Sequence, residues 1–217
     1  MLVLLPPSEG KAHPEAGAPV DLDALAFADE LGEKRAELLE AFDPSLREAA
    51  AAPAYEVYTG VLFKRLELPG LPARARKRVL IASALWGVVR PDDRIADYKF
   101  PPSTRLAGIG APNAFWRPAL AAALPDDEGE LVVDMRSGAY AAAWKPKRAT
   151  MLAVRAFTEE GGQRKAVSHM AKAVRGDVAR ALLTAKKAPS DPEGAAAIAE
   201  AAGFTVELSG GSLDVVV

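Results

Sequence analysis

Three short, mostly apolar runs constrain the fold of this chain more than any other feature of its sequence. They lie at Leu2–Leu5, Val79–Ser83 and residues 131–135. Such runs are typical of strands buried on both faces of a sheet, beneath covering helices. The first run ends at Pro6 and Pro7, which have no N–H to donate to a strand ladder. We therefore expect a central sheet built around these three segments.

Helical and further strand patterns alternate with these runs. One predicted helix starts at an Asp21 cap and extends to Phe42, with Pro44 as a stop. From about Met170 the pattern is helical again. The other predicted elements are strands at residues 151–157, 166–170, 204–208 and 213–217 and a helix at residues 195–202. This order predicts a mixed α/β (α+β) fold: a single domain over residues 1–217, with a central mixed sheet and flanking helices.

Composition excludes several kinds of chemistry. The 217 residues include no cysteine and two histidines, His13 and His169. This rules out disulfides, iron–sulfur clusters and a cysteine redox switch. Two histidines without cysteine are too few for a zinc site, so we predict no metal and no cofactor. His169 could serve as a general base or be structural.

Charge is distributed unevenly, although the net charge is only −2. Residues 1–57 hold 4 basic and 12 acidic side chains, whereas residues 145–187 hold 11 basic and 3 acidic ones. The basic segment faces a polyanion, or the two segments pack together and neutralise each other. With no targeting segment and no apolar run long enough for a membrane helix, we expect a cytoplasmic protein without membrane contact. We also expect a monomer.

Two polar segments near the start carry candidate site residues. Ser8, Glu9 and Lys11 follow the first apolar run, at the kind of strand end where open α/β sheets bind ligands. An ordinary polar loop is the alternative. Tyr58 and Thr59 could line a pocket with their hydroxyls, or simply end a half-buried strand.

A third candidate segment begins after the second apolar run. Arg90 could hold an anion through two hydrogen bonds, and Tyr98 and Lys99 could add to the same site. Alternatively, Arg90 bonds locally to Asp92 or Asp93, as is common in turns.

A fourth candidate site lies where the chain becomes helical near Met170. Lys172 and Arg175 are three residues apart and share a helix face. Cations at a helix N-terminus are unfavourable unless an anion offsets them, which favours an anion site. A salt bridge to Glu9 or to another acid is the alternative.

The segment 68–72, with the sequence Leu-Pro-Gly-Leu-Pro, resembles the hairpin of helix-hairpin-helix DNA binders. The second glycine of that hairpin is replaced by Pro72, so we predict a solvated turn. A phosphate contact by Arg74 or Arg76 remains open.

In their order along the chain, these segments resemble the YaaA peroxide-stress family. The resemblance covers nearly the whole chain and rests on the proline–serine loop after the first strand and on these segments: Val57-Tyr58-Thr59-Gly60, Leu85 to Asp93, Phe115-Trp116, Ser137 with Tyr140, and Ala171-Lys172 with Arg175-Gly176. The positions that match family motifs are Ser8, Lys11, Tyr58, Thr59, Arg90, Tyr98, Lys99, Lys172 and Arg175. The chain departs from the family at Tyr98-Lys99, where relatives carry Tyr-Arg.

The resemblance implies a cytoplasmic, non-enzymatic protein of the peroxide stress response. It would bind DNA through a positively charged cleft and help to limit damage linked to intracellular iron. The residues themselves also allow an enzyme that acts on a phosphorylated or nucleotide-like small molecule. Its candidate catalytic residues are Glu9, Lys11, Tyr58 and Lys172. A protein that binds an acidic partner is a third possibility.

Overall fold

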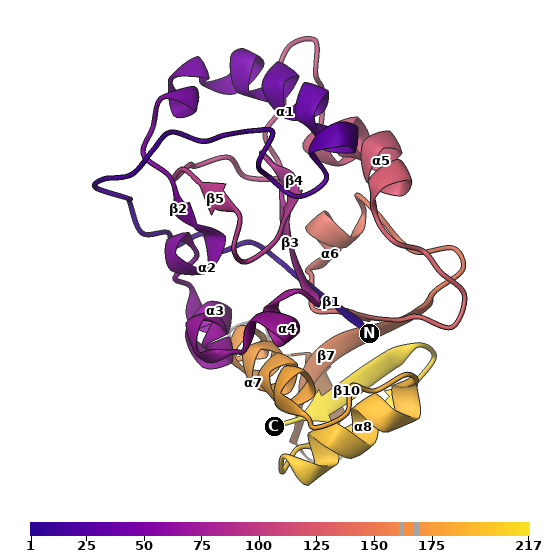
Figure 1. The fold of residues 1–217 in the computed structure, drawn as a ribbon. Helices are drawn as coiled ribbons and strands as arrows, with labels where there is room; N and C mark the ends of the chain where they lie inside the picture. Colours follow the sequence, from indigo (N-terminus) through magenta and orange to yellow (C-terminus); the bar gives the residue numbers. More distant parts are fainter. Residues whose placement is uncertain (161–162, 167–169) are drawn as a thin grey trace.

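A central mixed sheet organises the computed structural model, which describes residues 1–160, 163–166 and 170–217 (Figure 1). The strand order is β4-β3-β1-β6-β7-β10-β9, and β8 pairs with β7 off this path. The bounds are β1 Leu2–Leu5, β3 Val79–Ser83, β4 Gly87–Val89, β6 Leu131–Asp134, β7 Thr150–Glu160, β8 Gln163–Ala166, β9 Thr205–Ser209 and β10 Ser212–Val216. A separate short pair joins β2 Ala52–Pro53 to β5 Arg94–Ile95.

Helices flank this sheet, which confirms the predicted mixed α/β class. Their bounds are α1 Ala28–Phe42, α2 Ala54–Val57, α3 Val61–Leu66, α4 Ala73–Arg76, α5 Pro112–Ala123, α6 Gly138–Ala141, α7 Ala171–Thr184 and α8 Pro192–Ala201, with 3₁₀ turns η1 Pro44–Arg47 and η2 Leu68–Gly70. Among the residues described, no helix is both long enough and apolar enough to cross a membrane.

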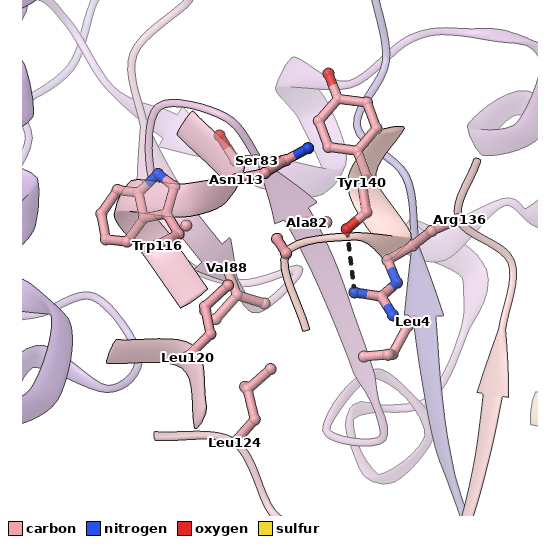
Figure 2. A pocket seen from close by; sticks show the side chains of 12 residues that line it. Leu4, Ala82, Ser83, Val88, Asn113, Trp116, Leu120, Leu124, Arg136 and Tyr140 are labelled. Carbon is pink, nitrogen blue, oxygen red and sulfur yellow. Dashed lines mark hydrogen bonds between the residues drawn. The ribbon is translucent and has the colours of Figure 1, made fainter. Parts of the chain in front are cut away.

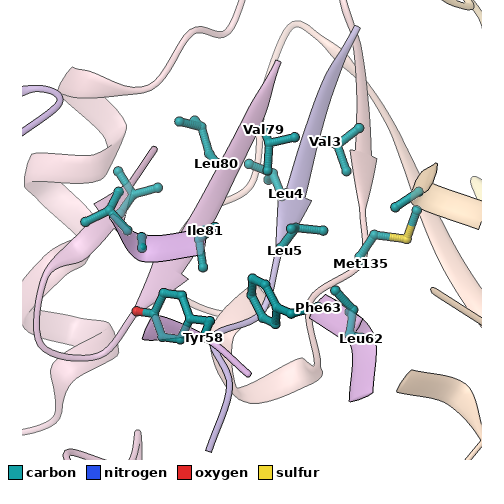
Figure 3. Close-up of a cluster of buried hydrophobic side chains, with 14 of the residues drawn as sticks. Val3, Leu4, Leu5, Tyr58, Leu62, Phe63, Val79, Leu80, Ile81 and Met135 are labelled. Carbon is teal, nitrogen blue, oxygen red and sulfur yellow. The ribbon is translucent and has the colours of Figure 1, made fainter. Parts of the chain in front are cut away.

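The three apolar runs form strands, as predicted, and the structure shows that these strands, β3, β1 and β6, are adjacent and parallel. Val3 of β1 pairs with Val79 on one side and Val133 on the other, and all three side chains are fully buried. Figure 3 shows β1 and β3 side chains packed beside Tyr58 and Phe63. Because the strands are parallel, the loops that follow them meet at one edge of the sheet.

Arg35 anchors α1 to the sheet. Its side chain is fully buried and donates from Nε to the Trp86 carbonyl at 3.1 Å. Its Nη2 donates to the carbonyls of Ala26 and Val88, each at 2.8 Å. Burial lowers the pKa of Arg35 to about 10, and the charge of Asp93 opposes this shift.

A glycine allows α7 to approach α3 closely. A Cβ on Gly176 would lie 2.5 Å from the Leu62 carbonyl oxygen, too close for any side chain. At the ends of the same contact, Arg65 binds Asp177 through two hydrogen bonds of 2.8 and 2.7 Å. The two helices therefore pack as one unit at their shared face.

The prediction for the first helix was wrong at its start. Asp21 accepts a hydrogen bond from the Asp23 amide and forms a turn instead of a cap. The helix starts at Ala28, after Phe27 adopts a left-handed backbone with φ of 60°. The Asp93 carboxylate accepts from the Ala26 amide and helps to hold this bend in place.

The second strand of the β7–β8 hairpin was predicted at residues 166–170, but its described part, β8, begins earlier, at Gln163. Gln163 pairs with Glu160, and Ala166, the first residue of the predicted segment, pairs with Phe157. Met170 lies in a turn before α7, and residues 167–169 lie outside the described part of the chain.

Candidate functional site

The first two candidate segments meet at the carboxyl edge of the sheet. The loop after β1 runs alongside the segment after α2, where the backbones of Lys11 and Tyr58 form an isolated antiparallel β-bridge. The Ala12 amide donates to the Val57 carbonyl at 2.8 Å, and the Thr59 amide donates to the Gly10 carbonyl at 3.1 Å. The backbone thereby holds the Lys11 and Tyr58 side chains in one place.

Ser8 and Gly60 make the closest approach within this site. Ser8 is buried, and its Oγ donates to the Gly10 carbonyl at 2.6 Å. A Cβ on Gly60 would lie 2.3 Å from that Oγ. Glycine at position 60 therefore lets the loop after β1 lie against the start of α3.

A chain of three buried hydroxyl groups lies beneath the loop. Tyr58 Oη lies 2.8 Å from Tyr98 Oη, which lies 2.7 Å from Ser83 Oγ. Ser83 Oγ also accepts from the Leu85 and Trp86 amides at 3.2 and 2.9 Å. Burial raises the pKa of both tyrosines above the ordinary value, so both hydroxyls keep their protons at neutral pH.

Lys11 is half-buried over these rings. Its Nζ lies 4.4 Å from the centroid of the Tyr98 ring and 5.9 Å from that of Tyr58. Within the described residues, this nitrogen makes no hydrogen bond and no ion pair. Burial lowers the pKa of Lys11, and the charges of Asp97 and Glu9 oppose that shift.

Tyr140 borders the same edge from α6. Burial raises its pKa to about 12, with a smaller contribution from the charge of Glu9. Arg136 supports Tyr140 by donating to its carbonyl at 3.4 Å (Figure 2). Arg136 is itself fixed by a buried ion pair with Asp134 at 2.8 Å.

The cavity that Arg136 and Tyr140 border is too small for a substrate. Its volume is about 20 Å³, which accommodates one water molecule. Figure 2 shows Trp116 on the opposite side, where its Nε1 donates to the Ala84 carbonyl at 2.8 Å. The cavity belongs to the packing beneath the site.

The structure does not bring Arg90 to this site. Strand β4 runs antiparallel to β3 and carries Arg90 back toward the amino end of β3. There its side chain donates to the Lys77 carbonyl at 2.9 Å. The alternative prediction was a local bond between Arg90 and Asp92 or Asp93. Such a bond forms only from the Arg90 backbone amide, which donates to the Asp93 carboxylate. Asp92 instead pairs with Arg76.

The remaining predicted cations have surroundings different from those of Lys11. Lys99 and Lys172 are exposed. Arg175 donates from Nε to the Val154 carbonyl at 3.0 Å, and burial lowers its pKa. In the described part of the chain, neither Lys172 nor Arg175 forms an ion pair with Glu9. His169 lies outside the described residues.

The turn predicted at residues 68–72 is present, but it is only partly solvated: Pro69, Gly70 and Pro72 are exposed. Leu68 and Leu71 are buried, and η2 joins α3 to α4 as a two-helix hairpin. Arg76 is tied to Asp92 at 2.9 Å and to the Leu71 carbonyl at 2.7 Å. The exposed cations of the hairpin are Lys64, Arg65, Arg74 and Lys77.

An open hollow of about 410 Å³ connects the hairpin to the tyrosine site. It extends from Tyr58 and Thr59 to Pro69 and Gly70 in the hairpin turn. Lys64 lies on its wall, and Tyr58 stacks on Phe63 with ring centroids 5.2 Å apart. The tyrosine site and the hairpin are therefore neighbours on one surface.

Sequence reasoning missed Ser83 as a site residue. It ends an apolar run, and its hydroxyl was assigned to a buried strand. The signal that could have identified it is a hydroxyl at the carboxyl end of a parallel strand, the same position that pointed to Ser8. Among the described residues, no three histidine, aspartate or glutamate side chains are grouped as metal ligands would be.

Comparisons with known proteins cover nearly the whole chain. A UPF0246 protein of Streptomyces coelicolor is 39% identical over 261 residues, which cover 100% of this chain and 98% of the relative. A UPF0246 protein of Corynebacterium efficiens is 36% identical, covering 97% and 96% of the two chains. The profile described as "Peroxide stress protein YaaA" matches residues 18–208. The chain therefore belongs to the peroxide stress protein YaaA family.

Proposed function

We propose that this protein acts in peroxide stress by binding DNA through the α3–η2–α4 hairpin. The observation that carries the proposal is the set of exposed cations on this hairpin. Lys64, Arg74 and Lys77 have no carboxylate partner among the described residues. The hairpin is short and rigid, with Leu68 and Leu71 buried beneath its turn. Cations on such a support suit a phosphate backbone, which contributes most of the affinity in sequence-independent binding.

Other charges of the hairpin are already compensated. Glu67 binds Arg180 at 2.9 Å, and Arg65 binds Asp177 at 2.7 Å. The acidic side chain nearest to the turn is thus neutralised by a neighbouring helix. The electrostatic potential at the hairpin surface is therefore set by Lys64, Arg74 and Lys77.

A salt titration tests this proposal. We expect wild-type protein to bind a short duplex with an affinity that falls steeply as salt rises. Lys64→Glu, Arg74→Glu and Lys77→Glu combined should weaken binding at least tenfold and lower the salt slope by about one for each phosphate that the variant no longer binds. The matched control is Lys145→Glu, Lys186→Glu and Lys187→Glu, which changes net charge equally at exposed positions elsewhere. Equal losses in both triple variants would reject the hairpin as the DNA surface.

We extend the proposal to damage caused by intracellular iron. Iron bound to DNA phosphates reacts with peroxide and generates radicals close to the deoxyribose. A protein that covers those phosphates would displace the iron. This predicts less nicking of a plasmid by iron and peroxide in the presence of wild-type protein than with the hairpin triple variant. We propose that the protein acts in the cytoplasm, as a monomer.

A second candidate function is supported by the convergence of Ser8, Lys11, Tyr58 and Thr59 at the carboxyl edge. Of these residues, Tyr58 and Thr59 line the open hollow. Hydroxyls and an ammonium group from neighbouring loops suit a phosphorylated or nucleotide-like small molecule. Thermal shift measurements with a panel of nucleotides and sugar phosphates test this function. A stabilising ligand whose effect disappears in Lys11→Gln would support it, and no shift across the panel would count against it.

A further inference from the structure

The hollow beside the hairpin is lined mainly by ring-bearing side chains. Those members are Tyr55, Tyr58, Phe63 and Pro69. Its volume of about 410 Å³ lies within the range of small-molecule sites. A double helix cannot enter a space of this size, whereas a single flat ring system can. The lining and the size together suit one nucleobase better than a phosphate group.

Tyr55 is the ring of this lining that solvent reaches. Tyr58 and Phe63 are buried and stack with ring centroids 5.2 Å apart, so they form a fixed floor. Tyr55 is only partly buried, and its helix α2 contacts the η2 turn of the hairpin. The Arg76 guanidinium lies 5.5 Å from the Tyr55 ring centroid and is itself held by Asp92 at 2.9 Å. The Tyr55 ring is therefore restrained before a ligand arrives, which lowers the entropy cost of stacking on it.

Lys64 connects the hollow to the cations of the hairpin. It is exposed, lines the hollow and has no carboxylate partner among the described residues. Glu67 also lines the hollow, but Arg180 compensates its charge at 2.9 Å. A phosphate bound at Lys64 would therefore meet little repulsion. The base of the same nucleotide would then lie next to the rings.

Thr59 adds a polar group to this apolar lining. Its side chain is partly buried, and no other described residue forms a hydrogen bond with its Oγ1. A hydroxyl both donates and accepts, so it can bond to the polar edge of any base. Stacking on aromatic rings is likewise tolerant of sequence. The lining thus distinguishes a base from no base, rather than one base from another.

We propose that the hollow binds an unpaired base of DNA while the hairpin cations hold the neighbouring phosphates. The proposal rests on the DNA-binding function above and names its substrate class, DNA with a base outside the double helix. Such a base enters at little cost because it has no partner to leave. A free nucleotide carries the same base and phosphate, and the experiments below separate the two sources.

Three duplexes of one sequence test the proposal. One is fully paired, one carries an extra unpaired thymine, and one carries an abasic analogue at that extra position, which distorts the backbone without offering a base. We expect wild-type protein to bind the duplex with the thymine at least about fivefold more tightly than the abasic one. This ratio should persist as salt rises, although all three affinities fall, because stacking releases no counterions. Equal affinities for the thymine and abasic duplexes would overturn the proposal.

Substitutions at Tyr55 assign the preference to the hollow. Tyr55→Ala should abolish the preference for the thymine without changing the salt slope, and Tyr55→Phe should keep it because the ring remains. The matched control is Phe115→Ala, at another partly buried ring with a cation against it, Lys34 at 4.3 Å. Thermal midpoints verify that each variant folds. A folded Tyr55→Ala that keeps the preference, or its loss in Phe115→Ala as well, would count against the hollow.

Photocrosslinking of the wild-type chain needs no substitution. The unpaired thymine is replaced by 5-iodouracil, which crosslinks to aromatic side chains that it contacts. We expect the modified residue to lie between Tyr55 and Phe63. A crosslink confined to any other segment would overturn the proposal.

The same measurements distinguish this proposal from the DNA-binding function on which it rests. Salt-dependent binding of all three duplexes with equal affinity would overturn the base site and leave the hairpin as a DNA surface. A crosslink at residues 55–63 from single-stranded DNA, with no binding of paired duplex, would reject the hairpin function and retain the base site. Thymidine monophosphate binding that needs Tyr55, with equal affinities for the thymine and abasic duplexes, would overturn DNA as the source of the base.

Discussion

Arg35 and Lys11 are both cations withdrawn from water, but their surroundings differ. Arg35 is fully buried and donates three hydrogen bonds to backbone carbonyls. Lys11 is only half-buried, yet its nitrogen has no hydrogen-bond acceptor among the described residues and lies over two rings. The Arg35 guanidinium holds elements together through these carbonyls, whereas the Lys11 amine makes no such bond among the described residues. Depth of burial alone therefore does not show whether a cation of this fold is held by hydrogen bonds.

The largest effect should come from removing the Arg35 anchor. Arg35→Met would leave the carbonyls of Ala26, Trp86 and Val88 without their donor in a buried position. We expect a loss of about 3 kcal/mol or more in the free energy of unfolding, from urea denaturation. Lys11→Met should cost less than about 1 kcal/mol. If the two variants lost similar amounts of unfolding free energy, the contrast between Arg35 and Lys11 would be wrong.

A medium effect should follow from disturbing the loop that positions Lys11. Gly60→Ala places a Cβ 2.3 Å from Ser8 Oγ, so the loop after β1 must shift. We expect a cost of about 1–3 kcal/mol in the free energy of unfolding. Ser8→Ala removes the clashing oxygen, so the double variant should recover more than half of that cost. Strictly additive effects in this double-mutant cycle would show that the two residues do not press on each other.

The smallest effect concerns pH. The folded pKa of Lys11 lies below the ordinary value of 10.5, so the unfolded chain binds more protons between these two values. Stability should therefore rise with pH across that window in wild type, relative to Lys11→Met. Denaturation curves at several values from about pH 8 to about pH 10 measure this difference. Parallel pH profiles would indicate that Lys11 is solvated like a surface lysine.

The sequence predicted what depends on local patterns. The buried strands were identifiable because burial produces continuous apolar runs such as Leu2–Leu5, and strand ends pointed to Ser8 and Lys11. Contacts that depend on how the chain turns back in the fold could not be predicted from the sequence. Arg90 was assigned to the site because nothing local shows that β4 turns back along β3. The role of Ser83 depends on Tyr98, which approaches it only in the folded chain. The positively charged cleft and the extent of the single domain remain predictions.

The position of β1 has a consequence for synthesis on the ribosome. Val3 pairs with Val79 and Val133, so β1 must wait for partners made roughly 75 and 130 residues later. At about 5–20 residues per second, the second partner arrives on the order of 10 s after the first strand is made. Until β3 is made, this apolar segment has no strand to pair with, and until β6 is made, one of its two edges stays unpaired. The nascent chain therefore presents an open edge of β1 as a target for chaperones until β6 has left the exit tunnel.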